Sequence, residues 1–282
     1  MWRLLRLALT ALTCLPAFGE LVFPDGLSNE ATAALIEKYS PAPKNKAFAV
    51  SEDGKRFYYL FNADPAEKVA RTALLRCLVS HGSPCLLLKV NDEDVSANYA
   101  RANTNALNAI ASLPQKLSKK SYADEDTSMG VMPTSTLRDS QSIHAATPTT
   151  APNGVKLITT PELVQLYKTE SELVVIDALL DRNYKKPTLP KANWLLGAGW
   201  FDVNRNKTID ANFSLIMAAL VSDKNRPIVA YCSNWECWLS FNAAVRLTTL
   251  GYTNVYWYRG GMEAWKAANL PTVETPITGQ LF

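Results

Sequence analysis

The sequence has little net charge, few cysteines and no long apolar run. Its 29 lysines and arginines nearly balance its 26 aspartates and glutamates, so the charge does not predict nucleic-acid binding. A membrane-spanning helix needs about twenty apolar residues, and the apolar stretch near the amino terminus has only about half that length. Hydrophobic residues nevertheless make up 48% of the chain, with seven tryptophans. We therefore expect a soluble globular protein with real cores and without a membrane span after signal cleavage.

Residues 1–19 have the pattern of a secretory signal peptide. Two arginines precede a run rich in leucine and alanine, and Ala17 and Gly19 form a small-x-small cleavage site. We expect cleavage near Gly19 and Glu20, and export to the periplasm or the exterior. An uncleaved anchor or a lipid on Cys14 fits this short apolar run less well.

Cleavage would leave four cysteines in two close pairs, Cys77 with Cys85 and Cys232 with Cys237. In an oxidising compartment, close pairs of this kind predict disulfides. The first would be structural, tying the end of a helix to the next strand. His81 lies between these two cysteines, but three ligands are too few for a structural zinc site, and we expect neither a metal nor a cofactor there.

The composition divides the exported chain into four segments. Residues 20–112 read as a small α/β domain, with strands near 47–50, 57–61 and 86–90 and a helix beginning near 66. Residues 113–152 are rich in Ser, Thr, Asp, Pro and Ala without an apolar period, which predicts a flexible, disordered linker in which His144 is solvated. We expect a second α/β domain over 153–276 and a short tail over 277–282.

The second domain alternates strands with helices. Apolar runs at 173–176 and 227–231 have no polar alternation, which indicates strands buried on both faces, as in a parallel sheet. Three segments have helical patterns, namely 160–168, 239–250 and 262–268. A further strand is expected at 255–257. The sequence predicts an open parallel sheet with helices on both faces. Cys232 directly follows a strand, where a thiol would face the positive end of the next helix and become a nucleophile.

These landmarks resemble the rhodanese-like domain superfamily. The resemblance rests on the strand-ending Cys232, the run Leu-Gly-Tyr-Thr-Asn-Val at 250–255, the glycine pair at 260–261 and Trp265, with supporting matches at 174–177 and 189–193. Residues 231–238 are most similar to exported rhodanese-like proteins that carry a paired-cysteine-tryptophan motif. That resemblance implies an association with PQQ-dependent alcohol catabolism and a quinoprotein alcohol dehydrogenase system as partner. Arg259 stands where that group has a proline.

The loop also departs from the family. Ordinary rhodanese loops use small residues and an arginine to arrange amides around a persulfide or an anion, whereas residues 232–237 contain neither glycine nor arginine. Glu236 would disfavour a thiolate and repel thiosulfate or phosphate, so ordinary thiosulfate sulfurtransfer is not expected. Cys237 takes the place of the arginine. We expect a reversible disulfide in which Cys232 attacks and Cys237 resolves, giving sulfurtransferase-like or thiol-disulfide oxidoreductase-like chemistry.

Two alternatives remain open from the sequence. A permanent Cys232–Cys237 disulfide would leave a non-catalytic partner-binding module, and two free thiolates would suit delivery of a soft ion such as Cu(I). The partner would be a protein or a small sulfur compound in the periplasm. Among the loop residues, we expect Trp235 as an exposed contact and Trp238 as core. The remaining binding or positioning candidates are Ser233, Asn234, Glu236 and the strand-ending Asp177, which we expect mainly to cap a turn.

Overall fold

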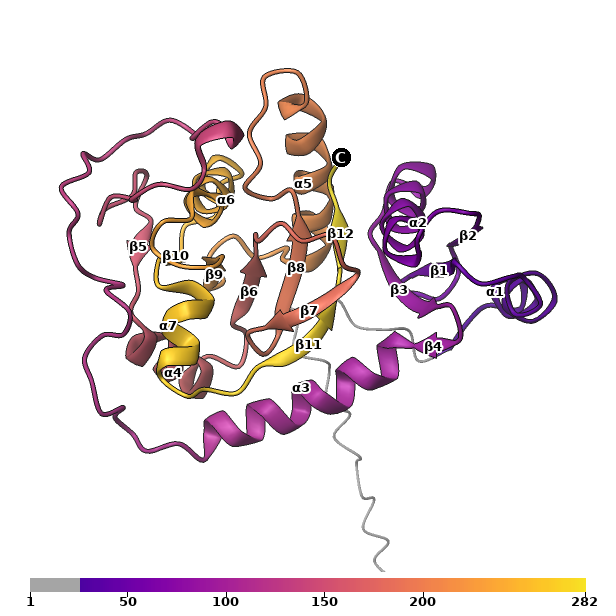
Figure 1. The fold of residues 1–282 in the computed structure, drawn as a ribbon, viewed down its shortest axis with the longest axis horizontal. Helices are drawn as coiled ribbons and strands as arrows, with labels where there is room; N and C mark the ends of the chain where they lie inside the picture. Colours follow the sequence, from indigo (N-terminus) through magenta and orange to yellow (C-terminus); the bar gives the residue numbers. More distant parts are fainter. Residues whose placement is uncertain (1–25) are drawn as a thin grey trace, which may run out of the picture.

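The computed structural model describes residues 26–282, so the predicted signal peptide and Cys14 lie outside the described part of the chain. Within that part, an amino-terminal α/β unit lies beside a larger unit built on a parallel sheet, as Figure 1 shows. No helix among residues 26–282 has the length and apolar character needed to cross a membrane.

The amino-terminal unit is an antiparallel sheet in the order β2-β1-β3-β4. On the long helix α2, one stripe of apolar residues at helical spacing is buried, and Gly82 ends the helix in a left-handed conformation. The stripe consists of Val69, Ala70, Ala73, Leu74, Cys77 and Leu78. The elements are α1 (Asn29–Ala34), the π-helical turn η1 (Leu35–Tyr39), β1 (Lys46–Ser51), β2 (Phe57–Phe61), α2 (Ala66–His81), β3 (Cys85–Val90), β4 (Glu93–Asp94) and α3 (Val95–Ala111).

The larger unit is a parallel sheet in the order β12-β8-β6-β9-β10-β5. Helices α5 and α6 cover one face and α4 and α7 cover the other, each with its own apolar core. The predicted open parallel α/β sheet is thereby confirmed. Its elements are β5 (Lys156–Leu157), α4 (Thr160–Thr169), β6 (Val174–Asp177), β8 (Ala192–Leu196), α5 (Asn206–Leu220), β9 (Ile228–Tyr231), α6 (Trp238–Thr249), β10 (Val255–Tyr258), α7 (Gly261–Ala267) and β12 (Gly279–Gln280).

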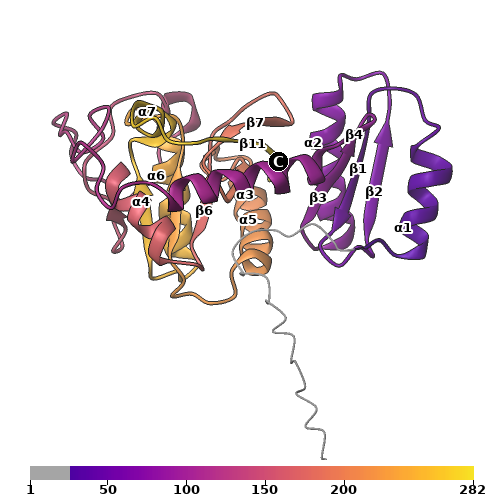
Figure 2. The ribbon, with the colours of Figure 1, turned by 90° about the horizontal axis from the view of Figure 1, so that it is seen from below.

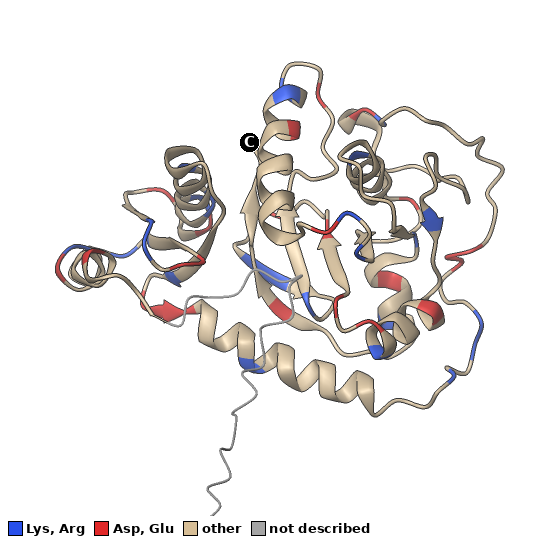
Figure 3. Cartoon of the chain, turned by 180° about the vertical axis from the view of Figure 1, so that it is seen from behind, with Lys and Arg blue, Asp and Glu red and all other residues tan. Residues whose placement is uncertain are grey.

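Helix α3 connects the two units. It begins at the N-cap Asp94, whose side chain accepts from the backbone N–H of Ala97. It then runs along the larger unit, where its buried face meets α4 and the strand β11 (Val273–Pro276), which pairs with β7 (Lys185–Thr188). Figure 2 shows this course from below, and the colours of Figure 3 show that α3 contains almost no charged residues. The helix therefore fixes the amino-terminal unit to the edge of the parallel-sheet unit.

Two segments differ from the sequence expectations. Residues 113–152 have almost no regular structure apart from the 3-10 turn η2 (Ser140–Ser142), but they lie against the larger unit with Tyr122, Glu125 and Thr147 buried. Buried polar groups in this segment have hydrogen-bond partners, so it does not behave as a solvated linker. The expected tail at 277–282 instead supplies β12, which pairs with β8 and closes one edge of the sheet.

Candidate functional site

Cys232 and Cys237 lie at the carboxyl end of the central strand β9, where α6 begins. In the structure their sulfur atoms are bonded to each other, and each residue is only 1% exposed. Cys237 is the N-cap residue of α6, so the sulfur pair lies at the positive end of that helix. Residues 232–237 form the two-cysteine loop that the sequence placed after this strand. The structure thus brings together the two cysteines at the position where open parallel sheets bind ligands.

Ser240 is the polar side chain closest to this sulfur pair. Its Oγ lies 3.2 Å from Cys232 Sγ and accepts a hydrogen bond of 3.0 Å from Trp257 Nε1. Because the indole can only donate, the hydroxyl hydrogen of Ser240 remains to be donated. Its acceptors within reach are Cys237 O, at 3.3 Å, and the Cys232 sulfur. After reduction, Ser240 is therefore placed to donate to a thiolate on Cys232.

Two backbone carbonyls of the loop face helix α7. The carbonyl oxygen of Cys232 accepts from Met262 N at 3.0 Å, and that of Ser233 accepts from Glu263 N at 2.9 Å. Gly261 permits this approach: its φ is +55°, and a Cβ built there would lie 2.4 Å from Cys232 O. Only glycine tolerates both conditions. The start of α7 thus holds the loop through its carbonyl groups.

Residues 143–147, which we call the covering segment, lie over the outer side of the loop. Trp238 N donates to Ile143 O at 3.0 Å, and Ala145 N donates to Glu236 O at 3.0 Å. His144 forms an isolated antiparallel bridge with Cys237, while its side chain is exposed as expected. This strand-like pairing shields the disulfide. Sequence reasoning placed these residues in a mobile linker because their partners are backbone atoms about ninety positions later in the chain.

Thr147 and Arg259 hold the end of the covering segment. Thr147 Oγ1 donates to Trp235 O and accepts from Arg259 Nε at 2.8 Å. The buried Arg259 also donates to Thr147 O at 3.1 Å and to Glu125 O at 3.0 Å, and its guanidinium lies 5.6 Å from the centre of the Trp235 ring. Burial lowers the pKa of Arg259, and the charges of Asp126 and Asp124 oppose this shift. Arg259 was a departure from the family pattern in the sequence, and here it fastens the covering segment to the loop.

The remaining loop residues have distinct environments. Trp238 is buried against Phe241, with ring centroids 5.0 Å apart, which agrees with the expected core role. Trp235 is half-buried beside Arg259 rather than freely exposed. Asn234 Nδ2 donates to Glu263 Oε2 at 2.9 Å, and Glu236 is exposed. The two tryptophans therefore support the loop, and Glu236 is its most accessible side chain.

A comparison with known protein families identifies the unit that contains this loop. Residues 159–268 match the family described as Rhodanese-like domain. The chain carries a rhodanese-like domain. The match covers α4 through α7, including the loop of Cys232 and Cys237, and confirms the resemblance at the level of the superfamily. No curated protein matches the chain.

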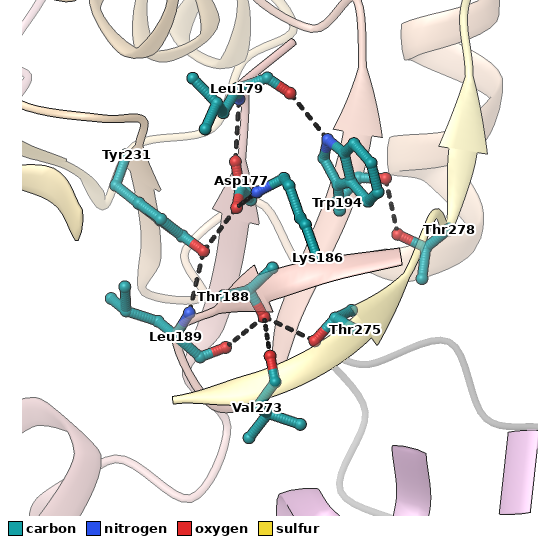
Figure 4. Close-up of polar contacts among 10 residues, drawn as sticks. All are labelled: Asp177, Leu179, Lys186, Thr188, Leu189, Trp194, Tyr231, Val273, Thr275 and Thr278. Atoms are coloured by element: carbon teal, nitrogen blue, oxygen red, sulfur yellow. Dashed lines mark hydrogen bonds and ion pairs between the residues drawn. The ribbon is translucent and has the colours of Figure 1, made fainter. Parts of the chain in front are cut away.

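Asp177 lies at the centre of a buried network of hydrogen bonds and an ion pair in the rhodanese-like domain. It is fully buried at the end of β6, where Oδ1 accepts from Leu179 N at 2.8 Å and Oδ2 forms an ion pair with Lys186. Tyr231 donates to Oδ2 at 2.7 Å and accepts from Leu189 N at 3.0 Å, as Figure 4 shows. Burial and the charge of Asp177 raise the pKa of Tyr231 well above its usual value. This network caps a turn and joins three strands, which is the main role expected for Asp177.

The Cys77–Cys85 disulfide lies outside the rhodanese-like domain. The two residues join the end of α2 to the start of β3, their Cα atoms are 6.1 Å apart, and both are buried in the core of the amino-terminal unit. Within residues 26–282 no group of three or more His, Cys, Asp or Glu side chains is placed to hold a metal ion. The geometry of this pair is that of a crosslink within a core.

Proposed function

We propose that the rhodanese-like domain performs thiol-disulfide or sulfur-relay chemistry through Cys232 and Cys237. The observation that carries the proposal is the asymmetric environment of the sulfur pair. Cys232 Sγ has the Ser240 hydroxyl at 3.2 Å, whereas no side-chain hydroxyl forms a hydrogen bond with Cys237 Sγ among the described residues. A hydrogen bond to a thiolate favours the charged form, so Cys232 is the better leaving group and the better attacking thiolate.

The reaction balances with the two cysteines alone. In the oxidising direction, the Cys232 thiolate attacks a substrate disulfide or persulfide, forms a mixed disulfide or a persulfide, and releases a thiolate. The Cys237 thiolate then attacks Cys232 Sγ, which forms the internal disulfide and releases the second thiolate or hydrosulfide. In the opposite direction the same steps reverse: a substrate thiolate attacks Cys232 Sγ and releases the Cys237 thiolate. A second thiolate then attacks the substrate sulfur of the mixed disulfide, and Cys232 leaves as the thiolate. Reduction of the internal disulfide by two substrate thiols completes the cycle.

Access to the sulfur atoms requires movement of the covering segment. Both cysteines are 1% exposed, and residues 143–147 close the outer side of their loop. Local opening of such a segment has a lower free energy than global unfolding when few apolar contacts hold it. The covering segment is held by backbone hydrogen bonds, by Arg259 and by the side chain of Ile143, which is buried in the core of the larger unit. We infer that its opening regulates reaction with a partner.

The test is the reduction potential of the Cys232–Cys237 pair. The mature protein is equilibrated across a glutathione series, the free thiols are alkylated, and each pair is quantified by mass spectrometry. A potential between about −120 and −230 mV is expected for an exchanging pair. In a Cys237→Ser variant, the remaining Cys232 thiolate should attack a substrate disulfide, release one thiolate and stay trapped as a mixed disulfide. The matched Cys232→Ser variant should trap less, because Cys237 lacks the Ser240 hydroxyl.

A second candidate is a non-catalytic partner-binding module with a permanent disulfide. The near-complete burial of both cysteines favours it. In that case the potential would lie below about −300 mV, and Cys232→Ser would reduce stability without removing function. Delivery of Cu(I) would require the reduced pair, and it predicts stoichiometric copper binding that both Cys→Ser variants abolish.

The proposed setting is the periplasm. Partners would be protein thiols or small sulfur compounds, and the paired-cysteine-tryptophan motif favours a quinoprotein alcohol dehydrogenase system. Cell fractionation, with mass measurement of the mature amino terminus, would test export and cleavage near Glu20. Recovery of full-length protein from the cytoplasm would contradict this setting, because cytosolic reductants would keep exposed exchanging thiols reduced.

A further inference from the structure

A groove separates the amino-terminal unit from the rhodanese-like domain. Its volume is about 720 Å³, within the range of small-molecule sites. One wall is the outer face of α2, with Leu75, Arg76 and Val79, and the other includes Trp200 and Phe282. Figure 1 shows α2 facing β12 across this region. None of its lining residues belongs to the loop of the sulfur pair or to the covering segment, so the groove is separate from the proposed redox site.

The lining combines apolar surface with two unsatisfied polar atoms. The rings of Trp200 and Phe282 have centroids 5.9 Å apart. Trp200 Nε1, a donor, and Gln280 Oε1, an acceptor, are both buried and lack a hydrogen-bond partner among residues 26–282. Both residues line the groove. Leaving a buried polar atom unpaired costs free energy, and a ligand with polar groups beside an apolar body would supply the missing partners.

The charge along the groove is predominantly positive. Four basic side chains line it, namely Lys68, Arg71, Arg76 and Arg182, against the single acid Asp181. Lys68 already pairs with Asp64, and Arg71 donates to the backbone of Asp181. By contrast, the exposed guanidinium groups of Arg76 and Arg182 make no hydrogen bond or ion pair with the described residues. A guanidinium is suited to binding a carboxylate or sulfonate through two parallel hydrogen bonds.

We propose that this groove binds a small amphipathic anion, with an aliphatic or aromatic body and a carboxylate or sulfonate head group. The apolar body would lie against Leu75, Trp200 and Phe282. The head group would interact with Arg76 and Arg182 at the opening. This ligand site does not depend on the chemistry proposed for Cys232 and Cys237, and it would give the connection between the two units a binding role.

The test uses the full mature chain and the fluorescent aromatic sulfonate 8-anilinonaphthalene-1-sulfonate as probe. One saturable site is expected, and octanoate should displace the probe. Octanol and octylamine, which have the same apolar chain without the negative charge, should compete at least about tenfold more weakly. Arg76→Gln and Arg182→Gln should each weaken octanoate binding about threefold, and the double variant about tenfold. Arg101→Gln removes the same charge from an exposed position on α3 and should leave binding unchanged.

A charge introduced into the groove provides a second, independent variant. Val79 is 63% exposed on the groove wall, so Val79→Glu should fold normally and weaken octanoate binding at least about tenfold. Ile36→Glu is the matched control, because Ile36 is 62% exposed on the amino-terminal unit away from the groove. Equal competition by octanol and octanoate, unchanged binding in both arginine variants, or absence of a saturable site would each overturn the proposal. The reduction potential of Cys232–Cys237 should remain unchanged in all these variants.

Discussion

Removal of the Thr147 hydroxyl is the smallest perturbation that tests whether the covering segment controls access to the disulfide. Thr147 is fully buried, its Oγ1 donates to Trp235 O, and the same atom accepts from Arg259 Nε at 2.8 Å. Thr147→Val keeps the side-chain shape but removes both hydrogen bonds. Trp235 O would retain only the longer bond from Thr147 N, at 3.3 Å, and Arg259 Nε would lose its acceptor.

The expected change in the reduction rate follows from the free energy that an unpaired buried donor costs. A buried group left without its partner costs about 1–3 kcal/mol, more for a charged one, so we take about 2 kcal/mol for the loss at Thr147. If this free energy is lost only from the closed form, the equilibrium constant for opening the covering segment increases by the corresponding factor. Because about 1.4 kcal/mol corresponds to tenfold, the reduction rate of Cys232–Cys237 should rise roughly 30-fold when opening precedes attack.

The assay measures reduction of each disulfide over time in dithiothreitol, with quenching by alkylation and analysis by mass spectrometry. Cys77–Cys85 is an internal control, because it is buried in the amino-terminal unit and should be reduced at the wild-type rate. Thr104→Val, at an exposed position of α3, is the matched substitution. An unchanged rate at Cys232–Cys237 would refute control by the covering segment. Equal acceleration of both disulfides would instead indicate global unfolding.

Three further predictions concern the site and its surroundings. Ser240→Ala should raise, by about one unit, the pH midpoint for alkylation of reduced Cys232, because the thiolate loses a donor worth about 1.5 kcal/mol. Gly261→Ala should lower the free energy of unfolding by about 2 kcal/mol or more in chemical denaturation, since φ is +55° and the new Cβ meets Cys232 O. Burial raises the pKa of Glu125, so its ionisation should remove stability as pH rises from the unfolded value of 4.5 through the raised native pKa. Denaturation of Glu125→Gln across this window should lack that loss, and an identical pH slope in both proteins would contradict the assignment.

The parallel sheet and the position of Cys232 were predictable because their signals are local. The unbroken apolar run of β9 and the glycine after α6 indicate a buried strand and a helix end without knowledge of the fold. The stripe on α2 likewise identified its buried face, and the close spacing of Cys77 and Cys85 indicated a disulfide. Each inference needs only a few neighbouring residues, which is why the structure agrees with it.

Helix α3 was not assigned from the sequence, although it carries a signal. Its N-cap Asp94 is followed by Tyr99, Asn103, Ala106 and Ile110, which are buried at helical spacing. The stripe includes a polar residue and several small ones, so its apolar period is weak. Tyr99 and Ala106 gain their apolar neighbours from β11, far along the chain. Burial of this face depends on a tertiary contact that the local sequence does not encode strongly.

The covering segment was misread for a different physical reason. It lies in residues 113–152, which are rich in polar types without an apolar period, and in an isolated chain such a stretch cannot bury enough apolar surface to become ordered. Here the interactions come from elsewhere in the chain. The backbone of the loop supplies hydrogen-bond partners to residues 143–147, and Arg259 donates to Thr147 and to the backbone around Glu125. Composition alone does not reveal such partners, because every residue type carries the same backbone groups.

The environment of Arg259 also explains why thiosulfate transfer is not the function that this geometry favours. An anion-binding rhodanese loop needs donors directed at the site that the anion occupies. In this chain Arg259, whose guanidinium lies 5.6 Å from the Trp235 ring of the loop, uses its donors on Thr147 and on backbone carbonyls. These carbonyls belong to Asp124, Glu125 and Thr127. The loop directs two carbonyl groups toward α7, and its accessible side chain is the acidic Glu236. The positive charge that would attract an external anion therefore holds a segment of the chain itself over the disulfide. Reaction with a thiol after local opening fits this arrangement better than binding of a small anion in the closed form.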